Sequence, residues 1–259
     1  MTVSRFTRLF ARCWWFNVKA LTQSSFFVLT STIQPVIFAT IAFYMWRAGA
    51  RPGSLLYVAL GAGLMGVWST TLFATGGVIQ WQRWQGTLEL NVAAPVAFFV
   101  ILIPWTAGPA FVGLYSIGST LLWGRLLFGV PLAIVHPLGF ALSIPATVTA
   151  LGALGIVMSS TFVLYRQSSA FANLLEYPIW LVTGLLIPVS LLPGWVRPIS
   201  WCLAPTWGVR AIRSAALGGD PWFPIGMCFA LSAAYFLVGM FTMSNFERLA
   251  RKNATLSLT

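Results

Sequence analysis

Charged residues are scarce in this sequence, and acidic residues are almost missing. Its 259 residues include 15 Lys and Arg but 4 Asp and Glu, so that 7% of the chain is charged. A soluble domain has about 25% charged residues. Because so few charges cannot cover a surface exposed to water, a soluble enzyme, a nucleic-acid-binding domain and a disordered protein are poor interpretations. With 58% hydrophobic residues and a mean hydropathy of +0.85, the composition predicts an integral membrane protein.

Residue types that carry catalysis or bind metals are also few. The cysteines and the single histidine show no CxxC or HxxxH spacing, at Cys13, Cys202, Cys228 and His136. We therefore expect neither a metal site nor a disulfide framework, and no cofactor bound by this chain. The four acids are isolated from one another, at Glu89, Glu176, Asp220 and Glu247. This isolation disfavours a catalytic acid pair.

A phosphate-binding loop is missing too. A P-loop requires a Lys that follows a Gly, whereas the two lysines follow Val and Arg, at Lys19 and Lys252. Any ATP hydrolysis must therefore come from another polypeptide, which would hold ATP and Mg²⁺. The pattern GxGxxG does occur, at Gly61, Gly63 and Gly66, but it lies inside an apolar run. There it indicates close packing between helices rather than a dinucleotide site.

Six apolar stretches are long enough to cross a bilayer. A spanning helix needs about 20 mostly apolar residues, and the stretches cover residues 25–46, 55–79, 96–123, 136–165, 168–191 and 222–246. Pro35 is expected to kink the first of them. We predict an all-α integral membrane fold with six transmembrane helices, forming a single domain over residues 1–259.

The distribution of positive residues indicates the orientation. Six spans place both termini on the same side, and that side holds nine Lys and Arg against six on the other. Seven of the nine lie in the two chain ends. Because Lys and Arg are enriched in cytoplasmic loops, we predict a multi-pass protein of the cell membrane with both termini in the cytoplasm.

Residues 4–21 predict an amphipathic helix. The basic residues recur on one helical face, at Arg5, Arg8, Arg12 and Lys19, and apolar residues fall largely on another, at Phe6, Leu9, Phe10, Cys13, Phe16 and Ala20. A basic face opposite an aromatic face is typical of a helix that lies in the membrane interface. The alternative is an ordinary basic flank before the first span.

Two connections differ from simple loops. Residues 81–95 are the most polar stretch on the cytoplasmic side, and Glu89, which follows Gly-Thr-Leu, suits the start of a helix. Residues 192–221 lie outside, and three prolines interrupt this apolar segment. We expect short re-entrant or interfacial helices there, with tryptophans at headgroup depth at Trp195, Trp201 and Trp207.

Two sets of residues carry a resemblance to a known family. The first is Arg83, Gly86-Thr87-Leu88-Glu89 and Pro95; the second is Gly184, Pro188, Leu192-Pro193-Gly194-Trp195, Pro205 and Arg213. In these motifs the chain resembles the ABC-2 type transporter permeases, the membrane subunits of type V ABC exporters, with the drug- and antibiotic-export permeases of the daunorubicin type as the nearest branch. The resemblance extends over nearly the whole chain. It departs from the family where an acid often precedes the Arg, since Trp81 and Gln82 stand there.

The resemblance implies a dimer of two permeases, identical or paralogous, docked on two ATP-binding subunits. The coupling helix that contacts the ATPase would comprise Arg83, Trp84, Gln85, Gly86, Thr87, Leu88, Glu89 and Pro95, and the N-terminal helix would add a second contact. ATP-driven closure would open a path for an amphipathic, lipid-like or drug-like substrate. Candidate residues of the path are Glu176, Tyr177, Phe38 and Trp68, and the cap of its exit would be Trp195, Trp201 and Trp207.

Two other function classes stay open. One is a polytopic membrane enzyme that acts on lipids, whose mark would be an acid pair assembled between spans. The other is a sensor or scaffold without transport activity that binds a partner through residues 81–95. In every case we expect contact with membrane lipids and no binding of nucleic acid.

Overall fold

The computed structural model describes residues 3–48, 54–87, 90–91, 97–164, 168–185 and 187–253. This part of the chain consists of helices and short connections and holds no strand. The helices are α1 (Val3–Gln23), α2 (Ser25–Ala48), α3 (Leu55–Trp84), α5 (Phe98–Phe128), α6 (Pro137–Leu164), α7 (Ser168–Val182), the 3-10 helix η1 (Val189–Leu191), α8 (Val196–Cys202), α9 (Ala204–Leu217) and α10 (Trp222–Asn253).

Four of the described helices are long and apolar enough to cross a membrane, over Leu55–Leu72, Phe98–Phe128, Pro137–Ser159 and Trp222–Asn245. Together with the composition, they confirm an all-helical, multi-pass membrane protein. The predicted fifth stretch, 168–191, is not one continuous helix. With 15 residues, α7 rises about 22 Å, less than the hydrocarbon core of about 30 Å. The six crossings therefore remain a prediction.

The helix breaks after α7 because of its backbone. α7 ends at Val182 and Gly184 has a φ of +81°, in the left-handed region that favours glycine. The predicted 192–221 segment then forms short helices, as expected. α9 is the longest of them, and it packs against α6, α10 and α3.

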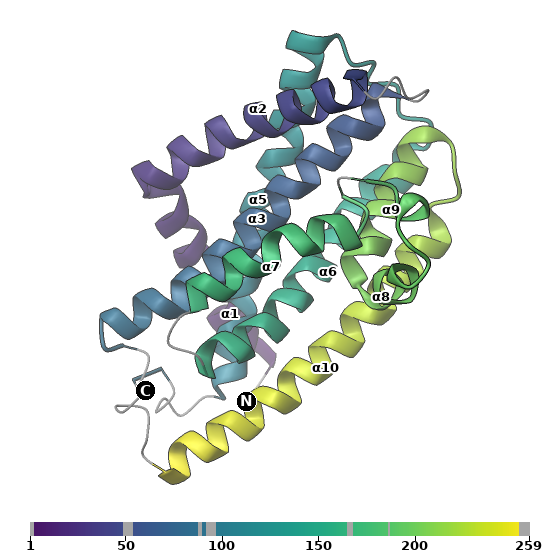
Figure 1. Ribbon diagram of the computed structural model, residues 1–259. Coiled ribbons are helices and arrows are strands. Elements are labelled where there is room, and N and C mark those ends of the chain that lie inside the picture. The colour runs from purple at the N-terminus through teal and green to yellow at the C-terminus, as the bar shows by residue number, and fades with distance from the viewer. Residues whose placement is uncertain are drawn as a thin grey trace.

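The long helices lie side by side and define two ends of the molecule (Figure 1). The last residues of α3, α6 and α10 lie at one end, which we call the α3–α10 end. The first residues of these helices, together with α8 and α9, lie at the opposite end, which we call the α9 end. Alternate long helices thus run in opposite directions, as membrane crossings joined in sequence must.

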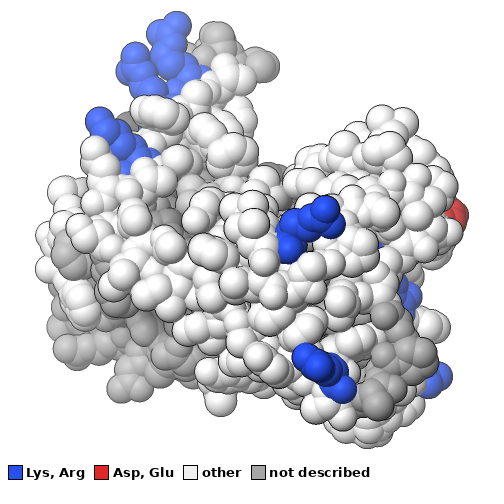
Figure 2. All heavy atoms as spheres, turned by 90° about the horizontal axis from the view of Figure 1, so that it is seen from above, with Lys and Arg blue, Asp and Glu red and all other residues white. Residues whose placement is uncertain are grey.

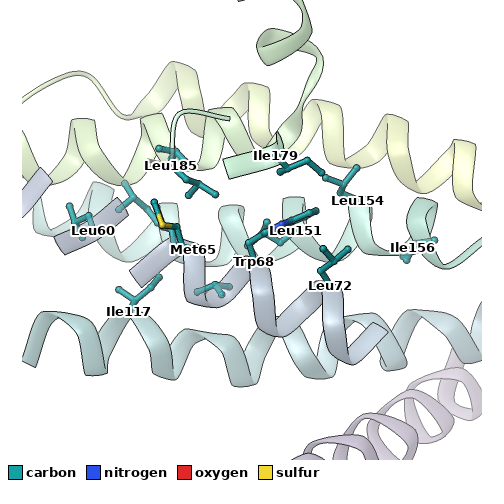
Figure 3. Packing of buried hydrophobic residues seen from close by; sticks show 14 of the residues in the cluster. Leu60, Met65, Trp68, Leu72, Ile117, Leu151, Leu154, Ile156, Ile179 and Leu185 are labelled. Carbon is teal, nitrogen blue, oxygen red and sulfur yellow. The ribbon is translucent and has the colours of Figure 1, made fainter. Parts of the chain in front are cut away.

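α3 is the centre of the core. Its side chains pack against α5, α6, α7 and the residues that follow α7 (Figure 3), and those labelled there are Leu60, Met65, Trp68, Leu72, Ile117, Leu151, Leu154, Ile156, Ile179 and Leu185. Every residue from 59 to 69 of α3 is buried. Because no face of this stretch is exposed, α3 is a helix surrounded by protein rather than by solvent or lipid.

The glycines of α3 let α5 approach closely. A Cβ added to Gly63 would lie 2.9 Å from the Cα of Ile117, and one on Gly66 would overlap the Oγ of Ser116. On the facing helix, a Cβ on Gly113 would lie 3.1 Å from the Cα of Val67. Small residues at such contacts are typical of helix pairs in membranes. The GxGxxG pattern is therefore a packing motif, as predicted.

Large apolar side chains cover much of the outer surface. Examples on three helices are Ile33, Ile37 and Ile41 of α2, Phe111, Tyr115 and Leu122 of α5, and Leu237, Val238 and Phe241 of α10. Figure 2 shows a face on which most side chains are uncharged, with a few Lys and Arg side chains together at the upper left and the others scattered. Contiguous apolar surface of this extent is rare on soluble monomers, and it suits contact with lipid.

Candidate functional site

The predicted coupling segment begins with a hydrogen-bonded turn after α3. Gly86 has a φ of +66°, the left-handed conformation that ends many helices. The N–H of Thr87 donates to the carbonyl of Gln82 at 3.0 Å, and the N–H of Asn91 donates to the carbonyl of Thr87 at 3.1 Å. Thr87 therefore closes the end of α3 and begins a new helical turn, in the position of an N-cap.

Side chains hold this turn as well. The Oε1 of Gln82 accepts hydrogen bonds from the hydroxyl of Thr87 and from the Nδ2 of Asn91, the latter at 3.1 Å. The same Nδ2 donates to the carbonyl of Thr87 at 3.0 Å. Sequence reasoning singled out Thr87 but not the two amide side chains. Their clustering in the most polar stretch of the chain was the available signal.

Apolar side chains flank the turn at the α3–α10 end. Trp84 is 73% exposed and Leu90 is 70% exposed, while Gln85 and Gly86 are exposed between them. Leu88, Glu89 and Pro95 lie outside the described residues, as does the side chain of Arg83. A fixed turn that presents large apolar groups is suited to binding another protein.

The described basic residues of α1 lie on the surface, and its predicted apolar face is partly covered by protein. Arg8, Arg12 and Lys19 are exposed, and the side chain of Arg5 lies outside the described residues. Phe16 of the predicted apolar face is 73% exposed, whereas Asn17 is 6% exposed. α1 packs along α5, and the surface of α5 decides which side of α1 is covered by protein.

A proline of α5 explains why Asn17 is buried. Pro109 has no N–H, so that the carbonyl of Trp105, four residues earlier, lacks its usual partner within the helix. The Nδ2 of Asn17 donates to this carbonyl at 3.3 Å. Beside it, the ring of Trp14 lies edge-on to that of Phe111, with 5.1 Å between centroids. α1 is thus attached to α5 by a polar contact that helical periodicity could not indicate.

The candidate pathway residues lie in different surroundings. Glu176 is 6% exposed and accepts a hydrogen bond from the hydroxyl of Ser69 of α3. Trp68 is 1% exposed and lies in the core (Figure 3). Phe38 and Tyr177 both contact the ring of Trp180, with centroids 5.3 and 5.2 Å away.

Trp180, which sequence reasoning missed, therefore connects α2 to the exposed side of α7. Its signal was the spacing of three residues from Tyr177, which places both rings on one helical face.

The Ser69–Glu176 contact gives a stability prediction. Ser69→Ala would leave a buried carboxyl oxygen without its donor, and we expect a loss of about 1–3 kcal/mol in the free energy of unfolding. Glu176→Gln keeps a carbonyl acceptor for the hydroxyl and should cost less than half as much. Equilibrium unfolding of both variants in one detergent measures the difference. Equal losses would show that the hydrogen bond contributes little.

The three tryptophans of the predicted exit cap are not equivalent. Trp195 is 71% exposed and Trp201 is 54% exposed, whereas Trp207 is 7% exposed. The Nε1 of Trp207 donates to the carbonyl of Trp201 at 2.8 Å, and the guanidinium of Arg210 lies 5.0 Å from its ring centroid. Trp207 therefore fixes α9 to its neighbours, and only Trp195 and Trp201 are available at the surface.

Arg213 of α9 is the most buried basic residue that the structure describes, at 8% exposure. Its Nη1 donates to the hydroxyl of Tyr57 at 2.9 Å and to the carbonyl of Gly184 at 2.5 Å, and its Nη2 donates to the carbonyl of Leu185 at 2.9 Å. The guanidinium also lies 3.7 Å from the ring centroid of Tyr57. One side chain thus joins α9, the break after α7 and the start of α3.

None of these arrangements resembles a metal centre. Within the ranges that the structure describes, no three His, Cys, Asp or Glu side chains lie close enough to hold a metal ion. The cysteines Cys13, Cys202 and Cys228 are free thiols. His136 is exposed near the start of α6, and Asp220 accepts a hydrogen bond from the N–H of Trp222 at the start of α10.

Comparison with known proteins identifies the family. The family model described as "ABC-2 type transporter" matches residues 8–217, a range that runs from α1 to the end of α9 and includes the turn at Thr87 and Arg213. Comparison with curated proteins gives no match. Because the match spans most of the chain and agrees with the helical, apolar fold, the protein belongs to the ABC-2 type transporter family, as a membrane permease component of an ABC transporter.

Proposed function

We propose that this chain is the membrane subunit of an ATP-driven exporter and that it works with ATP-binding subunits encoded separately. In this proposal two permeases, identical or paralogous, form a dimer on two ATPase subunits. The complex moves an amphipathic, lipid-like or drug-like molecule from the cytoplasm or inner leaflet to the outside. A drug-export role like that of the daunorubicin type is the narrower form of the same proposal.

The turn after α3 is the observation that carries the proposal. The side chains of Gln82, Thr87 and Asn91 fix its shape, and Trp84 and Leu90 are exposed beside it. Since the chain has no P-loop of its own, energy from ATP must enter through a contact with another protein. A turn that holds its shape transmits displacement into α3, which packs against most of the other long helices.

The fold supports one orientation of this complex. The turn lies at the α3–α10 end, where α10 also finishes, and the sequence after residue 245 is rich in Arg and Lys. Both features fit the cytoplasmic side. The α9 end, with the exposed rings of Trp195 and Trp201, then lies outside, where Trp is favoured at headgroup depth.

Co-expression tests the proposal. The tagged permease should co-purify with the ATP-binding subunit encoded beside it, and the complex should hydrolyse ATP while the isolated permease does not. A partner in which the P-loop Lys is replaced provides the control, since it should bind equally but be inactive. Failure to bind any ATP-binding subunit contradicts the proposal. Conversion of phospholipid by the isolated permease would favour the membrane enzyme instead.

A further inference from the structure

The positive charge of Arg213 has no acidic partner among the described residues. Its contacts there are a hydroxyl, two carbonyls and an aromatic ring, all of them uncharged. Of the carboxylates in the described part of the chain, Glu176 bonds to Ser69 and Asp220 caps α10. Buried cations are normally paired, because removing a charge from water is costly. The compensation visible within this chain is therefore incomplete.

The hydrogen bonds of the guanidinium are also incomplete. An Arg side chain has five N–H donors. The side chain of Arg213 makes three hydrogen bonds with the described residues. Its Nε is buried and has no partner. Dipoles of two carbonyls reduce the cost of burying the charge but do not neutralise it. The chemistry thus calls for an anion with several acceptor oxygens, which a guanidinium binds best.

A cavity of about 130 Å³ lies beside Arg213. This volume is several times what one water molecule needs. α2 contributes Ala42, Met45 and Trp46 to its wall, α3 contributes Tyr57, and the chain after α7 contributes Pro188. The helix break after α7 begins at the backbone of Gly184. This break therefore leaves space beside the uncompensated charge of Arg213.

In the orientation of the proposed function, the cavity lies near the depth of lipid headgroups. Trp46 is close to the end of α2 and Tyr57 is close to the start of α3, both at the α9 end. Their rings lie 5.9 Å apart, and Trp and Tyr are enriched at the membrane–water interface. A side chain with its charge at this depth meets phosphate groups rather than acyl chains.

We propose that Arg213 and this cavity form a binding site for an anionic phosphate group, carried by a membrane phospholipid or by a phosphate-bearing substrate. The headgroup enters between α2 and α3, and the phosphate oxygens accept hydrogen bonds from the guanidinium. Acyl chains then lie along the apolar outer side of α2. The inference rests on the membrane orientation of the proposed function but not on the ATPase partner.

Binding to the purified full-length chain in detergent tests the site. Native mass spectrometry is recorded during titration with phosphatidylglycerol, with diacylglycerol of the same acyl chains, and with inorganic phosphate as competitor. Arg213→Gln removes the charge. Ala42→Leu fills the cavity from α2 and leaves the hydrogen bonds of Arg213 in place. Arg210→Gln is the matched control, since Arg210 is on the same helix but lies over Trp207.

We expect both Arg213→Gln and Ala42→Leu to weaken phosphatidylglycerol binding at least ten-fold, Arg210→Gln to leave it unchanged, and diacylglycerol to bind weakly to every variant. Competition by inorganic phosphate at millimolar concentration indicates a soluble phosphorylated ligand, and no competition indicates the lipid. Unchanged phosphatidylglycerol binding in Ala42→Leu overturns the proposal, even where Arg213→Gln fails to fold. Because no ATPase is present, a failed co-purification would leave this result unaffected.

Discussion

Gly86→Val is expected to reduce the amount of co-purified ATP-binding subunit about ten-fold, while the permease still inserts into the membrane. Gly86 has a φ of +66°, and a Cβ there would meet no atom within 4 Å. The effect is therefore confined to the backbone. A left-handed conformation costs an L-residue about 1–2 kcal/mol, so the turn relaxes when free and must be restored on binding. About 1.4 kcal/mol corresponds to ten-fold in affinity.

Gly86→Asn is the matched control for this experiment. Asn adds a side chain in the same open space but tolerates the left-handed region better than other residues. It should retain most of the bound ATPase. Pull-down of the subunit with equal amounts of tagged permease measures both variants. If Val and Asn behave alike, the shape of the turn does not determine docking, and the coupling assignment fails.

Gly61→Val is expected to produce a large loss of stability. A Cβ at this position would lie 2.5 Å from the carbonyl oxygen of Leu185 and 2.5 Å from the Nη2 of Arg213. Arg213 can move only by giving up hydrogen bonds that tie α9 to the break after α7. Overpacking costs about 1–3 kcal/mol, and the lost hydrogen bonds of a charged group add about 1.5–3 kcal/mol.

Thermal unfolding of Gly61→Val in detergent, followed by tryptophan fluorescence, checks this expectation against Gly118→Val. Gly118 lies within α5, where a Cβ would meet no atom within 4 Å, so that this control should unfold near the wild-type temperature. Similar midpoints for the two variants would show that the approach of Arg213 and Leu185 to α3 is not important for stability.

Arg213 contacts both the start of α3 and the break after α7, and so connects these two regions. Its hydrogen bonds reach the carbonyls of Gly184 and Leu185 and the hydroxyl of Tyr57, which is 156 positions away in sequence. Displacement of α3 from the α3–α10 end would therefore also act on the break after α7 and on α9. A site for a phosphate group at this junction would respond to the state of the ATPase at the other end of α3.

Local features of the sequence predicted much of the fold. Boundaries of the helices followed the apolar runs, and the structure lengthened several of them, since α3 continues to Trp84 and α10 to Asn253. The fifth stretch, 168–191, was the exception, since it does not form one continuous helix. Hydropathy gives no sign of the left-handed backbone at Gly184. Short helices between 192 and 221 followed from prolines that interrupt an apolar segment.

Contacts between distant segments account for the differences between the predicted and the observed surroundings of residues at the candidate sites. Asn17 is buried because Pro109 leaves a carbonyl of α5 without a donor. Trp207 is buried because α9 packs against α6 and α10. Helical periodicity assigns residues to faces, but it does not say which face another helix will cover.

The sequence by itself determined that lipid surrounds the protein, that its fold is helical and which family it resembles. Hydropathy, charge and short motifs are properties of neighbouring residues, so they can be read without the structure. Few charges in 259 residues require lipid around the protein, and the residues around Thr87 and Arg213 carry the family resemblance. Only the tertiary structure decided that Arg213 is buried beside a cavity, with no acidic partner among the residues that the structure describes. That environment is built by α2, α3, α9 and the break after α7, and burial and pairing exist only once such distant segments meet.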